Sequence, residues 1–170
     1  ALRGLAKKSL LREIDYSLIE MTSFATHGVM SYESGLESPA LLLSEDPKEK
    51  NSKFLSLDDI NGLVGVSPLI LLSACNTATV DDAARQGGMT SSLLEGFLAR
   101  GAKMVISSYW AVESNATKEL MTVFSSLFYQ KPEKNASALF WSAVKNIKEN
   151  KLDYLDWGAF VPVGDYQRSN

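Results

Sequence analysis

Residues 68–73 read PLILLS, in which four large apolar residues follow one another without a polar break. Successive side chains of a strand point to opposite faces, so a run of this kind is typical of a strand buried on both faces. Such strands belong to parallel sheets that are covered by helices on both sides. The segment therefore indicates an α/β architecture.

The neighbouring segments fit the same architecture. Further strands are expected at residues 17–26, 39–43, 103–108 and 157–163. Pro162 puts the last of these at a sheet edge or at a strand end. Helices are expected at residues 57–61, 89–100, 114–129 and 135–150. Strands that alternate with amphipathic helices predict an α/β sandwich with a mostly parallel central sheet.

Two polar segments stand outside this alternation. Residues 1–15 form a basic, loosely helical lead-in, and we expect its basic residues, Lys8 and Arg12 among them, to form a solvated helix face. Residues 44–53, SEDPKEKNSK, are charged and polar and contain a proline. An exposed loop is expected there.

Composition narrows the possible functions. The chain has 170 residues, of which 45% are hydrophobic and 22% charged, and this suits a single domain with a buried core. A formal net charge of −3 provides no basic field for nucleic acid. The longest apolar stretch, residues 63–75, is too short to cross a bilayer. We therefore expect one domain over residues 1–170, with no direct nucleic-acid partner and no membrane partner.

The chain holds one cysteine and one histidine. It cannot form an intrachain disulfide, which fits a reducing, cytoplasmic location. A zinc site built from His and Cys would need ligands beyond these two residues. No metal and no organic cofactor is expected.

His27 and Cys75 each come just past the end of an expected strand. In open α/β sheets the active site lies beyond the carboxyl ends of the strands, so neighbouring strands would bring both side chains into one crevice. A cysteine thiolate is a strong nucleophile, and a histidine can take the thiol proton and later protonate the leaving amine. The backbone N–H groups of Gly28 and Cys75 can stabilise an oxyanion.

The spacing alone leaves a second interpretation open. A lone cysteine at the end of a buried strand is often a small core residue. A lone histidine after a strand is often a loop residue with a satisfied hydrogen bond. The residues by themselves therefore permit a catalytic pair without requiring one.

Four segments resemble the CHAT domain, a caspase-like family of cysteine peptidases related to separase. They are FATHG at residues 24–28, LSACNTA at 72–78, the stretch 87–112, and WGAFVPVGD at 157–165. The resemblance runs from about residue 17 to residue 165. It implies a caspase-like α/β/α sandwich, with the family's catalytic histidine at His27 and its nucleophilic cysteine at Cys75. It also implies regulatory domains or a partner chain upstream, and we expect residues 1–170 to be the C-terminal part of a longer chain.

Four further residues are candidates for the pocket that receives the substrate residue before the scissile bond (P1). Trp110 follows the expected strand at 103–108, at the position where the related peptidases shape this pocket. Glu113 can offer a carboxylate to a basic P1 side chain, although an acid at a helix N-terminus explains it as well. Asp81 and Asp82 are further candidates for the pocket, with a solvated loop as the alternative.

These features together predict a cysteine endopeptidase that hydrolyses a protein or peptide substrate through a thioester acyl-enzyme. The alternative is a catalytically silent caspase-like module that acts as a regulatory binding domain. A doubly wound domain that binds a small ligand is disfavoured, because the pair Gly87-Gly88 lacks the spacing and the lysine of a phosphate-binding loop.

Overall fold

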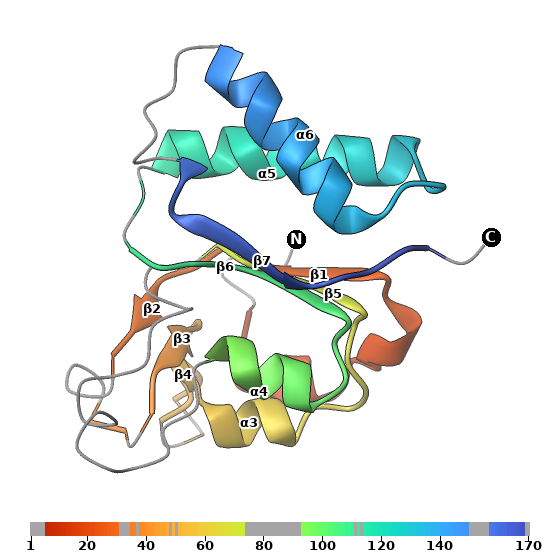
Figure 1. The fold of residues 1–170 in the computed structure, drawn as a ribbon. Coiled ribbons are helices and arrows are strands. Elements are labelled where there is room, and N and C mark those ends of the chain that lie inside the picture. The colour runs from red at the N-terminus through yellow and green to blue at the C-terminus, as the bar shows by residue number, and fades with distance from the viewer. Residues whose placement is uncertain are drawn as a thin grey trace, which may run out of the picture.

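A four-stranded sheet forms the centre of the computed structural model, which describes residues 6–30, 35–36, 38–47, 49, 51–73, 93–110, 112, 114–149 and 157–168. Its strands are β1 (Met21–Phe24), β5 (Leu69–Leu72), β6 (Met104–Ser108) and β7 (Phe160–Gly164), in the spatial order β1-β5-β6-β7 (Figure 1). The β1–β5 and β5–β6 pairs are parallel, and the β6–β7 pair is antiparallel. The expected mostly parallel α/β sheet is thereby confirmed.

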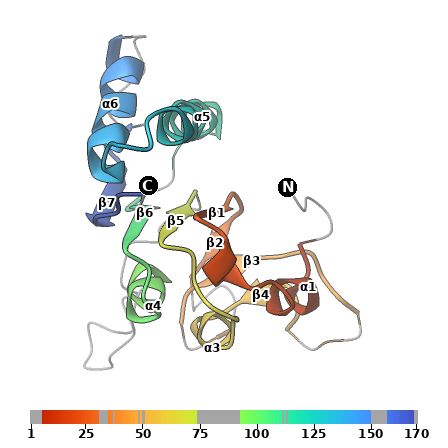
Figure 2. The ribbon, with the colours of Figure 1, turned by 90° about the vertical axis from the view of Figure 1, so that its right-hand side faces the viewer.

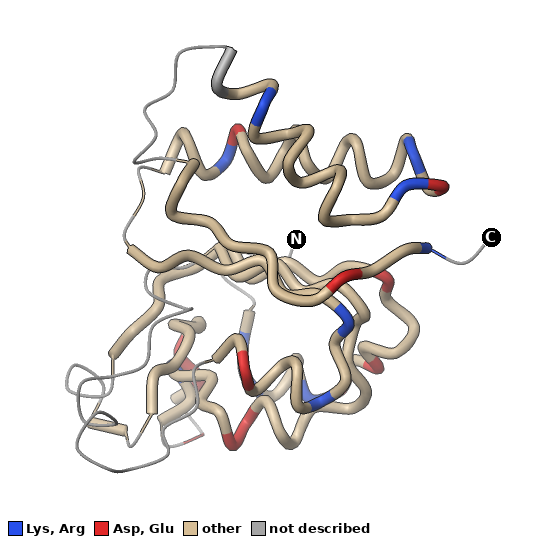
Figure 3. The backbone as a smooth tube through the Cα atoms, viewed as in Figure 1, with Lys and Arg blue, Asp and Glu red and all other residues tan. Residues whose placement is uncertain are grey.

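The two inner strands are buried on both faces, and β5 is apolar throughout, as the sequence predicted. Every residue of β5 and of β6 is buried. Leu69 and Leu71 contribute to one hydrophobic cluster, whereas Ile70 and Leu72 contribute to the other. Figure 3 shows Lys, Arg, Asp and Glu on helices and connecting segments, while β1, β5 and β6 carry none.

Helices cover both faces of the sheet. On one face lie α5 (Ser114–Gln130) and α6 (Ala136–Glu149), and on the other lie α3 (Leu57–Asn61) and α4 (Leu93–Ala99) (Figure 1). The α5–α6 layer packs around buried aromatic rings such as Phe124 and Phe140, whose centroids are 6.0 Å apart. No helix within the described ranges is long and apolar enough to cross a membrane. The layers agree with the predicted sandwich.

A second, smaller sheet was only partly expected. It consists of β2 (Gly28–Val29), β3 (Ala40–Leu42) and β4 (Phe54–Leu55), all antiparallel. The strand expected at residues 39–43 is present as β3, but β2 and β4 were missed. Two residues are too few to produce a period in the sequence, so nothing local indicated these strands.

The strand expected at residues 17–26 is present only as β1 (Met21–Phe24), so the expected strand was too long at both ends and most of all at its start. A short 3₁₀ helix, η2 (Tyr16–Leu18), precedes β1. The Asp15 side chain accepts a hydrogen bond from the Ser17 N–H at 3.0 Å, which caps this turn. Side-chain capping of this kind competes with strand formation, so β1 begins only at Met21.

The remaining elements lie close to their predicted places, and the first four residues of the helix expected at 89–100 lie outside the described residues. Helix α3 has the expected bounds, α5 and α6 differ from theirs by one residue, and β7 is an edge strand that begins three residues late. Within the expected loop at residues 44–53, Ser52 is the buried residue among those that the structure describes. Its hydroxyl donates to the Asp46 carbonyl and accepts from the Asp46 N–H, both at 2.8 Å. This segment is therefore anchored within the described residues.

The basic lead-in is helical at α1 (Lys8–Arg12), where Arg12 is exposed as expected but Lys8 is not. Lys8 is only 6% exposed, and its ammonium lies 2.8 Å from a carboxylate oxygen of Asp59 in α3. Arg12 reaches the other oxygen of Asp59 at 3.0 Å. The expectation failed for Lys8 because its partner, Asp59, lies about fifty residues further along the chain.

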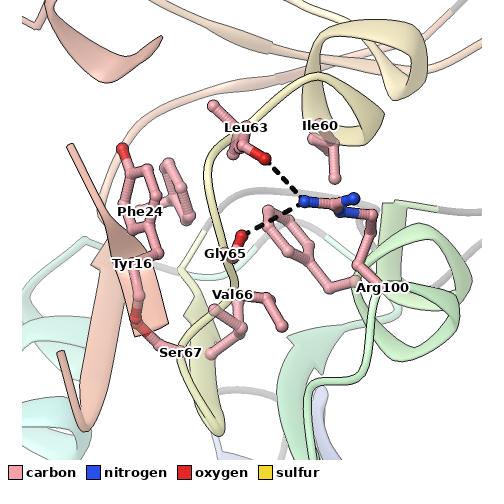
Figure 4. Close-up of a pocket in the computed structure, with 10 residues that line it drawn as sticks. Tyr16, Phe24, Ile60, Leu63, Gly65, Val66, Ser67 and Arg100 are labelled. Carbon is pink, nitrogen blue, oxygen red and sulfur yellow. Dashed lines mark hydrogen bonds between the residues drawn. The ribbon is translucent and has the colours of Figure 1, made fainter. Parts of the chain in front are cut away.

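The end of α4 secures the connection between α3 and β5. The Arg100 guanidinium donates hydrogen bonds to the carbonyls of Leu63 at 2.6 Å and Gly65 at 3.4 Å (Figure 4). Tyr16 lies on the other side of this connection (Figure 4), and burial raises the pKa of its hydroxyl to about 12. These contacts fix the position of the connection that leads into β5, and hence the position at which β5 ends.

Candidate functional site

Strands β1 and β5 end level with each other. Their parallel register runs from Met21 opposite Leu69 to Phe24 opposite Leu72. The pairing continues one step further, because the Ser73 N–H donates to the Phe24 carbonyl at 3.0 Å. The segments that leave the two strands therefore start side by side at the carboxyl edge of the sheet.

The small sheet holds the segment that follows β1. The Thr26 hydroxyl donates to the Leu42 carbonyl at 2.5 Å, and the His27 carbonyl accepts from the Leu42 N–H at 2.8 Å. The Thr26 side chain and the His27 carbonyl are thus both attached to Leu42 of β3, while His27 is exposed. This arrangement gives an imidazole a fixed backbone and an accessible ring.

Gly28 follows in β2, opposite Leu41 of β3. Because Leu42 bonds to His27, Gly28 and Leu41 form a non-hydrogen-bonded pair of the antiparallel ladder. The N–H of a residue in such a pair points away from the partner strand. Since β2 is at the edge of its sheet, the Gly28 N–H points to the unpaired side.

A groove of about 640 Å³ lies at this edge of the central sheet. Residues after all three parallel strands line it: Thr26 and His27 after β1, Ser73 after β5, and Ser108 at the end of β6. The Ser73 hydroxyl is buried and has no hydrogen-bond partner among the described residues. The groove therefore gathers hydroxyl groups and one imidazole where the strands end.

Helix α5 forms the other wall of the groove. Its lining residues are spaced three or four apart and so share one face of the helix; they are Ser114, Thr117, Lys118, Met121, Thr122 and Ser125. Leu120, Phe124 and Phe128 lie on the opposite, apolar side of this helix and are buried in the core. The hydroxyl pattern was a readable signal that we missed.

A second groove, of about 740 Å³, runs along the other side of β1. Among the described residues its lining includes no histidine, lysine or carboxylate, and Tyr16 is its one titratable group. The groove that contains His27 is therefore the candidate functional site.

Of the residues predicted for this site, the structure describes His27, Gly28 and Trp110. Trp110 is 38% exposed and is not among the described residues that line the groove. Four other predicted residues lie outside the described part of the chain: Cys75, Asp81, Asp82 and Glu113. The pairing of His27 with Cys75 and the makeup of the P1 pocket therefore stay predictions.

The model of the CHAT domain family matches residues 4–165, which is nearly the whole chain. A search among curated proteins gave no match.

Proposed function

Because the chain belongs to the CHAT domain family, which is caspase-like, we propose that it is a cysteine endopeptidase with His27 as acid/base and Cys75 as nucleophile. The observation that carries this proposal is the shared groove. His27 and Ser73 line it together, at the level edge of β1 and β5. Cys75 follows Ser73 by two residues, and two residues span at most about 7 Å. This short connection is compatible with a thiol that reaches the groove lined by His27.

The proposed reaction has two stages. In the first, the thiol proton passes to the His27 imidazole and the Cys75 sulfur attacks the peptide carbonyl carbon. The tetrahedral intermediate collapses, the C–N bond breaks, and His27 gives the proton to the leaving amine. In the second, His27 takes a proton from a water molecule that attacks the thioester, and the acid product and the thiol are released.

Backbone donors stabilise the negative oxygen of each intermediate in this proposal. The outward direction of the Gly28 N–H, derived from the β2–β3 ladder, supports its part in this role. The N–H of Cys75 is the second proposed donor. Such fixed donors act mainly when the oxyanion forms, so they lower the barrier rather than bind substrate.

The test compares cleavage of a pooled fluorogenic peptide library by the natural chain, Cys75→Ala and His27→Gln. The preparation includes any sequence that naturally flanks these residues, because we also propose control by upstream domains or a partner chain. Each variant is expected to lose activity by at least about a thousandfold, since the two groups act as one unit. Unchanged thermal unfolding midpoints serve as the folding control.

A thiol-reactive peptide that labels Cys75 provides an independent measurement. Labelling that is lost in Cys75→Ala, and slowed in His27→Gln, supports an activated nucleophile. Full cleavage activity in Cys75→Ala would refute the assignment. A folded protein that cleaves nothing and whose thiol is inert would instead favour the silent regulatory module.

A further inference from the structure

The charge of the groove distinguishes it from the rest of the surface. The described residues that line it include Lys118 and His27 but no aspartate and no glutamate. The chain as a whole has a formal net charge of −3, so the lack of carboxylates among the described lining residues sets the groove apart from the average surface. Its described lining is positive or neutral.

Lys118 is well placed to act on a ligand. It lies one turn into α5, beside Thr117 and four residues after Ser114, on the face that forms the groove wall. Its residue is exposed, so the ammonium group is accessible from the groove. An ammonium group offers three donors and a full charge, and its hydrogen bonds to a carboxylate are about twice as strong as neutral ones.

The start of α5 adds potential of the same sign. The helix has 17 residues and carries no acidic side chain in its first turn. Its N-terminal end therefore contributes a partial positive charge that its own first turn does not offset. The hydroxyls of Ser114 and Thr117 lie in the same part of the groove and can donate to an anionic group.

We infer that the groove selects peptide segments that carry an acidic side chain, whose carboxylate binds Lys118 on the α5 wall. This inference rests on the proposed peptidase function and adds its substrate class. Lys118 is then a specificity-determining residue, because it contacts the substrate side chain and not the scissile bond. Hydroxyl groups of the α5 wall, such as those of Ser114 and Thr117, can donate further hydrogen bonds to the bound carboxylate.

The opposite preference follows from the sequence-based idea that Glu113 receives a basic P1 side chain. A cation bound by Glu113 and an anion bound by Lys118 are mutually exclusive as the main determinant of one subsite. Charge reversal at Lys118 therefore distinguishes a preference for acidic peptides from a preference for basic peptides.

The test measures binding by fluorescence anisotropy, with the full chain carrying Cys75→Ala so that peptides stay intact. Labelled peptides place Glu, Gln or Lys at each position in turn. We expect one position at which Glu binds at least about tenfold more tightly than Lys, with the difference reduced by high salt. Lys118→Glu should reverse the order, and Lys118→Met should remove it.

Lys145→Glu is the matched control, because Lys145 is an exposed residue of α6 that does not line the groove. It makes the same change in net charge and should leave the order of the three peptides unchanged. The inference is overturned if Lys peptides bind more tightly, if no position depends on charge, or if no peptide binds. It is also overturned if Lys118→Glu and Lys145→Glu change the order of the peptides in the same way.

Failure of this inference is distinguishable from failure of the proposed function. Charge-dependent binding without cleavage by the chain with its cysteine would refute hydrolysis and leave the ligand class in place. Cleavage that does not depend on substrate charge would refute the ligand class and leave the hydrolysis in place. Where cleavage occurs, Lys118→Glu should change kcat/KM for Glu peptides and Lys peptides in opposite directions.

Discussion

Asp59 connects helix α1 to helix α3. It receives Lys8 and Arg12 from α1, and it also closes a capping box with Ser56 at the start of α3. Burial raises the pKa of its carboxyl. Hydrogen bonds from Lys8 and Ser56 lower the pKa by more than burial raises it, so the pKa lies below the ordinary value. The charged form of Asp59 therefore stabilises the folded state.

This pKa makes stability depend on acid. A carboxyl with a lowered folded-state pKa contributes stability above its unfolded-state pKa of about 3.9, and that contribution is lost as the pH falls through the folded-state value. Asp59→Asn should cost about 3 kcal/mol at pH 7, because it leaves the buried Lys8 ammonium unpaired. Urea unfolding between pH 7 and pH 3 should give a flatter profile for the variant than for the natural chain.

Glu49→Gln is the control for this prediction. Glu49 pairs with Arg12 at 2.9 Å, but the two side chains are 29% and 46% exposed, so the pair is screened by solvent. Its loss should change the free energy of unfolding by less than about 1 kcal/mol. Equal effects of Asp59→Asn and Glu49→Gln would contradict the role given to burial.

At the scale of elements, the register between neighbouring strands carries the candidate site. The β1–β5 register aligns the segments that bear Thr26 and Ser73, and the β2–β3 ladder then holds the backbone at His27. On the other side of the central sheet, β7 closes the edge by pairing with all of β6, from Met104 opposite Gly164 onwards. The end of β7 is therefore a sensitive point of the fold.

Gly164→Ala tests that point. Gly164 has a φ of +82°, and a Cβ atom there would collide with the Lys103 carbonyl oxygen. We expect a loss of about 2 kcal/mol or more, from backbone strain together with the clash. Gly35→Ala is the control, since Gly35 has a φ of +70° with open space around it, and it should cost about 1 kcal/mol. Thermal unfolding of both variants measures the difference, and equal midpoints would refute the clash.

At the scale of the whole molecule, Arg168 connects two parts of the chain that are far apart in the sequence. Arg168 makes two contacts with the Glu20 carboxylate, at 3.0 Å and 2.6 Å, and Glu20 immediately precedes β1. The same guanidinium lies over the rings of Phe128 and Tyr129 in α5, with centroids 5.4 Å and 5.6 Å away. Figure 2 shows α5 in cross-section above the sheet to which β1 belongs. Arg168 thus links the start of β1 to the α5 layer.

Arg168→Ala should destabilise the chain by about 1 to 2 kcal/mol, from the lost bidentate pair and the lost ring contacts. Arg168→Lys should recover only part of this, because an ammonium cannot make the same two-point contact. A double-mutant cycle with Glu20→Gln, measured by urea unfolding, should give a coupling energy of about 0.5 kcal/mol or more. Strict additivity would show that the pair contributes nothing.

Much of this architecture can be predicted from local sequence patterns. The unbroken apolar run of β5 and the periodic stripe of α5 are properties of adjacent residues, so they predict a buried strand and an amphipathic helix without any tertiary information. The motifs around His27 and Cys75 likewise indicated the family that the match to residues 4–165 then showed.

Other features depend on partners far away in the sequence. Lys8 is buried because Asp59 neutralises it, and β2 and β4 exist because β3 lies between them. Which face of α5 looks into the groove is decided by its packing on the sheet, so the significance of Lys118 emerges only in three dimensions. Local periodicity follows from covalent geometry, whereas strand register, ion pairing and groove charge follow from which distant segments come into contact.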